Sequence, residues 1–168
     1  MAMPGDGPYV AVVGPSDPDP ECYALAMEVG RLLAEHGVTV VCGGLGGVME
    51  AASLGASGAG GQVLGILPGR DRGDANPFLT LAVATGLGEI RNGLVVRASD
   101  AVVSVGGSWG TLSEVALAQR LGLPVVSLQG WSVVNQDGGS VVGPITASTA
   151  AEAVEVALGG AEQRRARP

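Results

Sequence analysis

Short, uninterrupted runs of Val, Ile and Leu alternate with longer, helix-like segments along almost the whole chain. The runs are YVAVV at 9–13, VTVVC at 38–42, QVLGIL at 62–67, AVVSV at 101–105 and PVVSL at 124–128. Continuous apolar strands of this kind are typical of a parallel sheet that is covered by helices on both faces. Because crossovers between parallel strands are right-handed, the alternation predicts an α/β fold with a doubly wound parallel sheet.

Helical spacing and turn residues mark the elements between these strands. Helices are expected at 21–36, 48–57, 89–98 and 111–121, and the capping-box pair Thr149 and Glu152 starts a last helix that runs to about 158. A further strand is expected at 79–85, a polar loop at 68–77 and an irregular segment at 130–143. With no repeat and no linker, residues 1–168 are expected to form a single domain, with flexible ends at 1–8 and 160–168.

The absence of lysine excludes two classes of protein. All nine basic residues are arginines. A pyridoxal-phosphate enzyme needs a lysine for its Schiff base, and a P-loop ATPase needs the lysine of its phosphate-binding loop. The chain has one histidine, His36, so neither a Ser-His-Asp triad nor a multi-histidine metal site is expected, and we predict no metal site.

The net charge of −7 argues against a nucleic-acid partner, because nucleic-acid-binding surfaces are basic. It is compatible with a small anion, since backbone amides and a single arginine can bind one. The sequence has no signal peptide and no apolar run of about 18 residues, so we expect a cytoplasmic protein without a membrane partner.

Clustered glycines follow three of the expected strands, at the edge of the sheet where ligands bind in doubly wound folds. They are Gly14 after the first strand, Gly43, Gly44, Gly46 and Gly47 after the second, and Gly106, Gly107 and Gly110 after the strand at 101–105. Glycine lets the backbone approach a ligand, and a helix that starts after such a loop offers free amides to a phosphate. The alternative is that they only form tight turns. NAD is not expected, because the third glycine and the acidic residue of the dinucleotide fingerprint are missing.

Several other residues at this edge have both a structural and a functional interpretation. Thr111 and Glu114 have the spacing of a capping box, but they could instead lie at a phosphate site. Arg91 is either solvated or a bidentate phosphate ligand. Trp109 could stack on a ring or close an oligomer interface. The candidate ligand-binding residues are Gly14, Ser16, Gly43, Gly44, Gly46, Arg91, Asn92, Gly107, Ser108, Trp109, Gly110, Thr111 and Glu114.

Three motifs, GGLGGVM at 43–49, Arg91-Asn92 and GGSWGTLSE at 106–114, resemble those of a known superfamily. This is the lysine-decarboxylase-like group, which includes the LOG phosphoribohydrolases and the molybdenum cofactor carrier proteins. The resemblance covers residues 9–130 and implies a Rossmann-like fold and a homodimer or homotetramer. The hydrolases carry Pro-Gly-Gly-x-Gly-Thr-x-x-Glu, whereas this chain has Gly106 at the proline and Ser108 at the second glycine. It also has Ser113 where they usually have the first of two glutamates, so it looks closer to the carrier-like branch.

The resemblance implies two functions. In the first, the protein binds a phosphorylated nucleotide-like or pterin-like molecule, such as a nucleotide or the molybdenum cofactor. Its phosphate would lie at residues 107–111, with residues 43–46 beside it and Arg91 as the counter-charge. In the second, the protein hydrolyses nucleoside 5′-monophosphates to a free base and ribose 5-phosphate, with Glu114 and Arg91 as catalytic residues. A third hypothesis is a structural or regulatory oligomer with a vestigial pocket.

Overall fold

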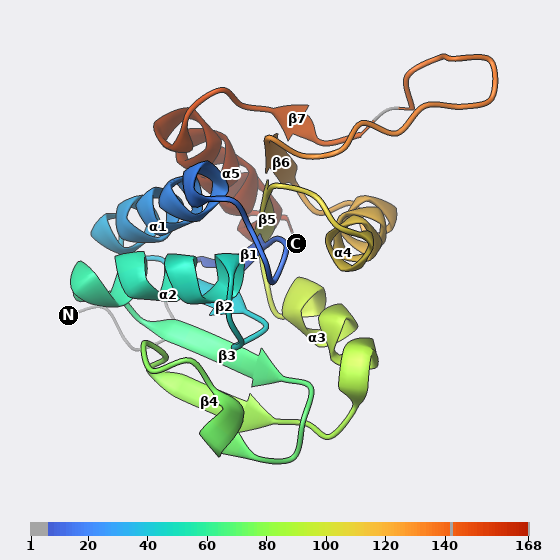
Figure 1. The fold of residues 1–168 in the computed structure, drawn as a ribbon. Coiled ribbons are helices and arrows are strands. Elements are labelled where there is room, and N and C mark those ends of the chain that lie inside the picture. The colour runs from blue at the N-terminus through green and yellow to red at the C-terminus, as the bar shows by residue number, and fades with distance from the viewer. Residues whose placement is uncertain (1–6, 142, 168) are drawn as a thin grey trace.

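A seven-stranded, entirely parallel sheet with the strand order β4-β3-β2-β1-β5-β6-β7 forms the centre of the protein (Figure 1). The structure is a computed structural model that describes residues 7–141 and 143–167. The expected single doubly wound α/β domain is confirmed. The strands are β1 Tyr9–Val13, β2 Thr39–Cys42, β3 Val63–Leu67, β4 Leu81–Ala84, β5 Ala101–Val105, β6 Val125–Leu128 and β7 Ile145–Thr146.

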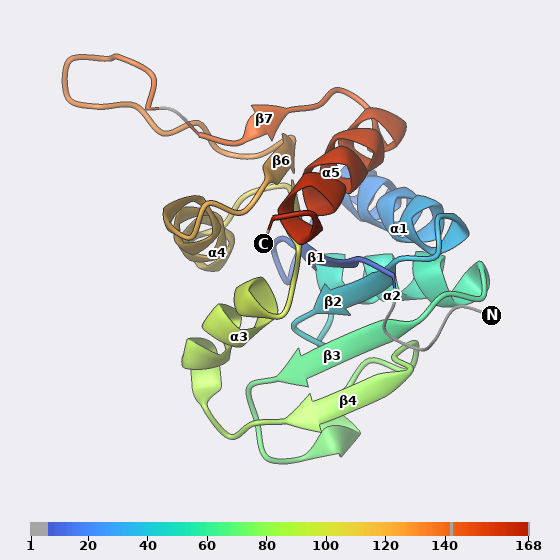
Figure 2. The ribbon, with the colours of Figure 1, turned by 180° about the vertical axis from the view of Figure 1, so that it is seen from behind.

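Helices cover both faces of this sheet (Figures 1 and 2). One face packs against α1, α2 and α5, and the other packs against α3 and α4. The helices are α1 Pro20–Glu35, α2 Val48–Gly58, α3 Asn92–Arg97, α4 Trp109–Arg120 and α5 Ala150–Arg165, and two short 3-10 helices are η1 Arg72–Asp74 and η2 Gly88–Arg91. Among the described residues, no helix is long and apolar enough to cross a membrane.

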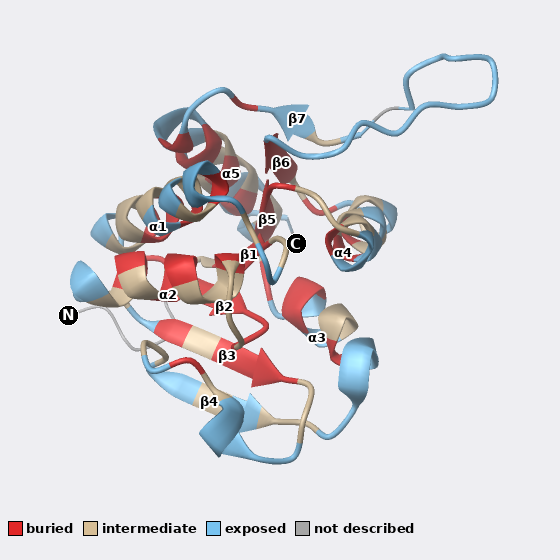
Figure 3. Ribbon diagram, viewed as in Figure 1, coloured by how far each residue is buried: buried red, intermediate tan, exposed pale blue. Residues whose placement is uncertain are grey.

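The hydrophobic core lies on both sides of the central strands, which Figure 3 shows as almost entirely buried. In β1, Val10 and Val12 pack towards α1, α2 and α5, whereas Ala11 and Val13 pack towards α3 and α4. This division follows from the strand period of two residues. It explains why β1 and β5 are continuous apolar runs rather than alternating ones.

Two glycines set the close packing of α1 against α2. A Cβ atom at Gly30 would lie 2.0 Å from the Ala52 carbonyl oxygen, and one at Gly55 would lie 1.9 Å from the Met27 carbonyl oxygen. Any larger residue at either position would force the two helices apart. This packing holds α1 against α2, which begins directly after the glycine loop that follows β2.

The C-terminal end differs from the sequence-based expectation. Helix α5 begins after its cap Thr149, whose hydroxyl accepts a hydrogen bond from the Glu152 amide at 3.2 Å, as the capping box predicts. It continues to Arg165, so the expected end of this helix at about residue 158 is wrong. Ala161 is buried and Gly160 packs against Pro124, and these contacts hold the last turns of α5 against the body of the protein.

Three further elements depart from the expectation. The segment at 89–98 is not one helix, because the 3-10 helix η2 ends at Arg91 and α3 begins at Asn92. The short edge strand β7 was not predicted. Of the expected loose extension at 1–8, residues 1–6 lie outside the described residues, and the Pro8 carbonyl accepts a hydrogen bond from the Thr39 amide at 3.1 Å.

Candidate functional site

The direction in which the strands are added to the sheet reverses between β1 and β5. From β1 the chain adds β2, β3 and β4 on one side, and it then crosses back to add β5, β6 and β7 on the other. Beyond the carboxyl ends of these two strands, where doubly wound folds bind ligands, lies an open cleft of about 340 Å³. Nine of the candidate residues line it: Gly14, Ser16, Gly43, Arg91, Asn92, Ser108, Gly110, Thr111 and Glu114.

The loop after β1 forms one wall of the cleft. A Cβ atom at Gly14 would lie 2.3 Å from the Val105 carbonyl oxygen and 2.7 Å from the Val48 side chain, so only glycine fits between β5 and α2. The Pro15 carbonyl accepts a hydrogen bond from the Val48 amide at 3.1 Å, which ties this loop to the first turn of α2. Ser16 lies exposed at the rim.

The glycine loop after β2 contacts the guanidinium group of Arg91, which belongs to η2. A Cβ atom at Gly43 would lie 2.7 Å from each terminal nitrogen of Arg91, so glycine is needed for the close contact. The other two candidates in this loop do not line the cleft. Gly44 has a φ of +77° and lies against Leu67, while the position of Gly46 has open space around it.

Arg91 is a buried cation without an ion-pair partner among the described residues. The residue is only 7% exposed. Its Nη2 donates to the Gly43 carbonyl at 3.2 Å and its Nη1 donates to the Asn92 side-chain oxygen, while its Nε has no acceptor in the described part of the chain. Burial lowers the pKa of Arg91, and the negative charge of Glu114 opposes that shift. An arginine keeps its proton even so, and the cleft therefore contains a buried positive charge that no carboxylate among the described residues pairs directly.

Glu114 lies in the same cleft, on α4. The residue is 7% exposed, and its carboxyl group forms no hydrogen bond with any residue that the structure describes. Burial raises the pKa of Glu114 to about 7, and the nearby Arg91 charge limits the increase. A carboxyl group with this pKa can both donate and accept a proton near neutral pH.

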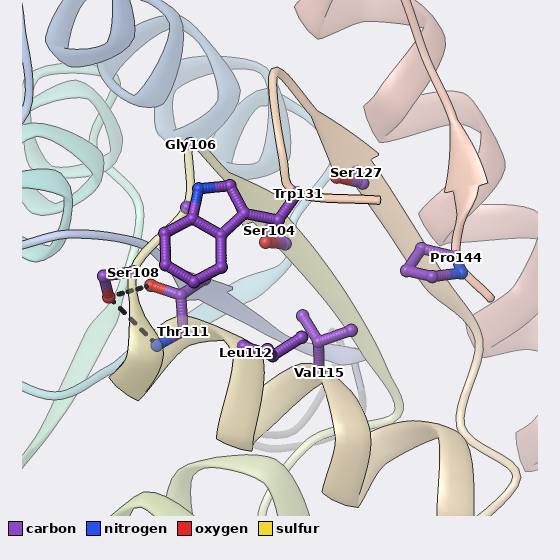
Figure 4. A pocket seen from close by; sticks show the side chains of 10 residues that line it. Ser104, Gly106, Ser108, Thr111, Leu112, Val115, Ser127, Trp131 and Pro144 are labelled. Atoms are coloured by element: carbon purple, nitrogen blue, oxygen red, sulfur yellow. Dashed lines mark hydrogen bonds between the residues drawn. The ribbon is translucent and has the colours of Figure 1, made fainter. Parts of the chain in front are cut away.

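The start of α4 is capped by Ser108 and not by Thr111. The Ser108 hydroxyl accepts a hydrogen bond from the Thr111 amide at 3.1 Å and lies 2.8 Å from the Thr111 hydroxyl (Figure 4). The capping-box interpretation of Thr111 and Glu114 is therefore wrong, because α4 begins two residues earlier than expected. This frees Glu114 from a capping role, and it places Gly110, whose amide is in the first turn of α4, at the cleft.

The structure requires glycine at the two positions that precede the cap of α4. Gly106 has a φ of +70°, which proline cannot adopt, so the hydrolase-type proline does not fit this loop. Gly107 lies under the indole ring of Trp131, because a Cβ atom there would lie 2.3 Å from the ring. Gly107 and Trp131 line a second pocket of about 20 Å³. Figure 4 labels Trp131 together with other residues that line this pocket. Trp109 is 79% exposed and contacts the ring of Trp131.

Sequence reasoning missed other residues of these two pockets. Met49, Pro68 and Glu89 also line the main cleft. Met49 lies on the first turn of α2, and this position next to the glycine loop could have indicated a cleft residue. A methionine at such a position is more often part of the core. Trp131 lies in the irregular segment at 130–143, and no sequence pattern indicated that it packs on Gly107.

The arrangement is suited to an anion. A buried arginine, a glycine loop and the amino end of α4 meet in one cleft of an otherwise acidic chain. The carboxyl group of Glu114 lines the same space and can exchange a proton near pH 7.

The chain is similar to known proteins in both sequence and structure. Residues 7–155 match the model of the SLOG cluster4 family. An uncharacterized protein of Archaeoglobus fulgidus is 46% identical over 120 residues, which cover 71% of this chain and 79% of that protein. The solved molybdenum cofactor binding protein of Rippkaea orientalis has a TM-score of 0.80 at 34% identity, covering 89% of this chain and 94% of that one.

A second solved structure, the molybdenum cofactor carrier protein of Chlamydomonas reinhardtii, has a TM-score of 0.77 at 29% identity. It matches 96% of this chain and 99% of its own. These similarities confirm the resemblance of the three motifs to the carrier-like branch. The chain belongs to the SLOG cluster4 family, within the LOG-like superfamily.

Proposed function

We propose that this protein binds a phosphorylated, pterin-like or nucleotide-like small molecule in the cleft between β1 and β5. The observation that carries the proposal is Arg91, a buried cation that lines the cleft and has only neutral hydrogen-bond acceptors. Burying a charge without a partner is costly, so a site of this kind is stabilised when an anion supplies the partner. The amino end of α4 adds a positive dipole on the same cleft.

The names of the solved relatives support a more specific ligand. Proteins that are 34% and 29% identical to this chain are described as binding or carrying the molybdenum cofactor. The cofactor is a phosphorylated pterin compound, and the residues present here fit its phosphate. Arg91 and the amide of Gly110 would hold that group, while Ser108 and Thr111 would keep the start of α4 in place.

Calorimetric titration tests the binding proposal. Ribose 5-phosphate and guanosine 5′-monophosphate are the probes, because the guanine ring shares its aminopyrimidinone part with pterins. We expect both to bind, and Arg91→Met to weaken both by about tenfold or more, as the loss of a charge-assisted hydrogen bond implies. Arg72→Met, which removes an exposed arginine outside the cleft, is the matched control. No binding at millimolar concentration, or equal binding by the Arg91 variant, would contradict the proposal.

A second candidate function is hydrolysis of nucleoside 5′-monophosphates to a free base and ribose 5-phosphate. The observation that favours it is Glu114, whose unbonded carboxyl group has a pKa of about 7 and lines the same cleft as Arg91. Such a carboxylate could stabilise the cation-like ribosyl group that forms when the glycosidic bond breaks, or orient the attacking water.

Chromatography of the released bases separates the two functions. The protein is incubated with a panel of nucleoside 5′-monophosphates, beside Glu114→Gln. Base release that is lost in the variant would make Glu114 and Arg91 catalytic residues. No release from any of the substrates at high enzyme concentration would leave the binding function alone.

The homodimer or homotetramer that the resemblance implies belongs to the same proposal. Apolar side chains on the edge strand β4 support it, since Leu81 is 65% exposed and Val83 is 48% exposed. Ile90, on η2, is 79% exposed. Light scattering of the purified protein measures the number of subunits.

A further inference from the structure

Two exposed tryptophans lie side by side next to the ligand cleft, and neither the fold nor the proposed phosphate site accounts for them. Trp109 is 79% exposed and Trp131 is 47% exposed. The ring centroids are 5.2 Å apart and the ring planes meet at 83°, an edge-to-face contact. These are the only two tryptophans of the chain. Tryptophan is enriched at binding surfaces, because it combines a large apolar ring with a polar N–H group.

Trp109 is adjacent in sequence to residues of the proposed phosphate site. It is the first residue of α4, and its sequence neighbours Ser108 and Gly110 both line the cleft. The Trp109 amide is one of the free donors at the amino end of the helix. The Trp109 side chain lines neither pocket, but its ring contacts the ring of Trp131. Trp131 lines the small pocket, which shares Ser108 and Thr111 with the cleft.

Trp131 lies in the segment after β6 and packs on the loop between β5 and α4. Its ring lies over Gly107, where a Cβ atom would be 2.3 Å from the ring. Two residues earlier, Gln129 has a φ of +51°, which is unfavourable for a residue other than glycine, and its side chain donates to Glu21 on α1 at 2.7 Å. The chain beyond Trp131 then extends away from the body of the protein (Figures 1 and 2). A strained, anchored backbone thus fixes Trp131 beside Trp109.

The pair geometry leaves aromatic surface available. In an edge-to-face contact the edge of one ring covers part of one face of the other, so the remaining faces can stack on a further ring. Stacking needs no charge and accepts any flat heteroaromatic ring, which suits a site whose charged groups already engage a phosphate.

We infer that the Trp109–Trp131 pair is the part of the site that recognises the flat heteroaromatic ring of the bound molecule, beside the phosphate held at the start of α4. This inference rests on the proposed function, and it deepens it by assigning the two tryptophans a role in ligand choice. A phosphorylated sugar without a ring system occupies only the phosphate part of the site, whereas a nucleotide-like or pterin-like compound occupies both parts.

Guanosine 5′-monophosphate and ribose 5-phosphate again serve as probes, since they differ by the aromatic base. The wild-type protein is expected to bind the nucleotide about 10-fold to 100-fold more tightly than the sugar phosphate, the range that aromatic stacking supplies. Trp109→Ala is expected to remove this preference while keeping the affinity for ribose 5-phosphate, and Trp109→Phe is expected to retain most of it. Met27→Ala, which truncates an exposed apolar side chain on α1 outside the cleft, is the control and should change neither affinity.

Fluorescence provides an independent readout. In Trp131→Phe the only tryptophan is Trp109, whose emission should be quenched by the nucleotide and not by ribose 5-phosphate. Equal affinities of the wild type for the two probes, or a preference that survives in Trp109→Ala, would overturn the inference while leaving the phosphate site intact. A change in subunit number in Trp109→Ala with the preference retained would show instead that the pair is a subunit contact. If neither probe binds the wild type, the proposed function fails, and this inference fails with it.

Discussion

The guanidinium group of Arg91 packs directly on the backbone of Gly43. Nη2 of Arg91 donates to the Gly43 carbonyl at 3.2 Å, and both terminal nitrogens would lie 2.7 Å from a Cβ atom at that position. The position of the Arg91 charge in the cleft therefore depends on Gly43, which has no side chain and is far from Arg91 in the sequence. The contact links the loop after β2 to the junction between η2 and α3.

Gly43→Ala tests this contact. Gly43 does not have a positive φ, so the backbone accepts alanine, but the side chains of Arg91 and Met49 have to move. We expect the affinity for ribose 5-phosphate to fall about tenfold, since the guanidinium loses its hydrogen-bonded position. The measurement is calorimetric titration. Gly46→Ala in the same loop is the control, because nothing lies within 4 Å of its Cβ position, and a similar loss there would contradict the explanation.

Glu114 is expected to make the stability of the protein depend on pH. Burial raises its pKa from 4.5 to about 7 in the folded state. The folded protein therefore keeps a proton that the unfolded chain releases, and stability falls as the pH rises from about 4.5 to about 7. Glutamine does not ionise, so Glu114→Gln removes this loss. The change in the free energy of unfolding caused by the substitution should therefore be more favourable at pH 8 than at pH 4, by up to about 3 kcal/mol.

Urea unfolding at the two pH values measures the difference. Glu155→Gln, on the exposed side of α5, is the control for the removal of one negative charge. An equal effect of Glu114→Gln at both pH values would show that the folded carboxyl group titrates like a solvated one.

Ser108 is expected to stabilise α4 as its cap. Ser108→Ala removes the acceptor of the Thr111 amide and should lower the free energy of unfolding by about 1 kcal/mol. Ser108→Gly, which restores the residue of the hydrolase pattern, should cost only a few tenths of a kcal/mol, since glycine is tolerated at this position. Chemical denaturation followed by circular dichroism distinguishes them. Equal stability of the wild type and the alanine variant would contradict the capping role.

The last turns of α5 offer a matched pair of adjacent glycines. Gly159 has open space at its Cβ position, so Gly159→Ala should stabilise the protein by about 0.5–1 kcal/mol through helix propensity. At Gly160 the Cβ atom would lie 2.5 Å from the Pro124 ring, so Gly160→Ala should destabilise by about 1–3 kcal/mol. Thermal unfolding measures both. If the two changes have the same sign, α5 does not dock on Pro124.

The sequence predicts the sheet well because each central strand is a continuous apolar run. The predicted bounds of β1 and β5 match the structure residue for residue. Placing the glycine loops at one edge also follows from sequence, because parallel strands end together. The structure adds the contact that brings Gly43 to Arg91, which depends on a crossover that no local pattern encodes.

Other parts could not be read from local pattern. Ser108 and Thr111 are both good capping residues, and only the geometry of the loop decides between them. The end of α5 contains two glycines and several charged residues, which indicate fraying unless the contact with Pro124 is known. The position of Trp131 depends on the positive φ of Gln129, and no pattern of residues predicts that backbone conformation.

Both cysteines lie next to the glycine loops that form the cleft. Cys42 ends β2, just before the loop that carries Gly43, and the sulfur of Cys22 would lie 2.8 Å from a Cβ atom at Gly106. Both thiols are buried, and burial raises the pKa of each. A thiol-reactive reagent can therefore modify them only when the adjacent loop opens. The rates at which the two sulfurs are alkylated, compared with and without ligand, measure how often each loop opens in solution.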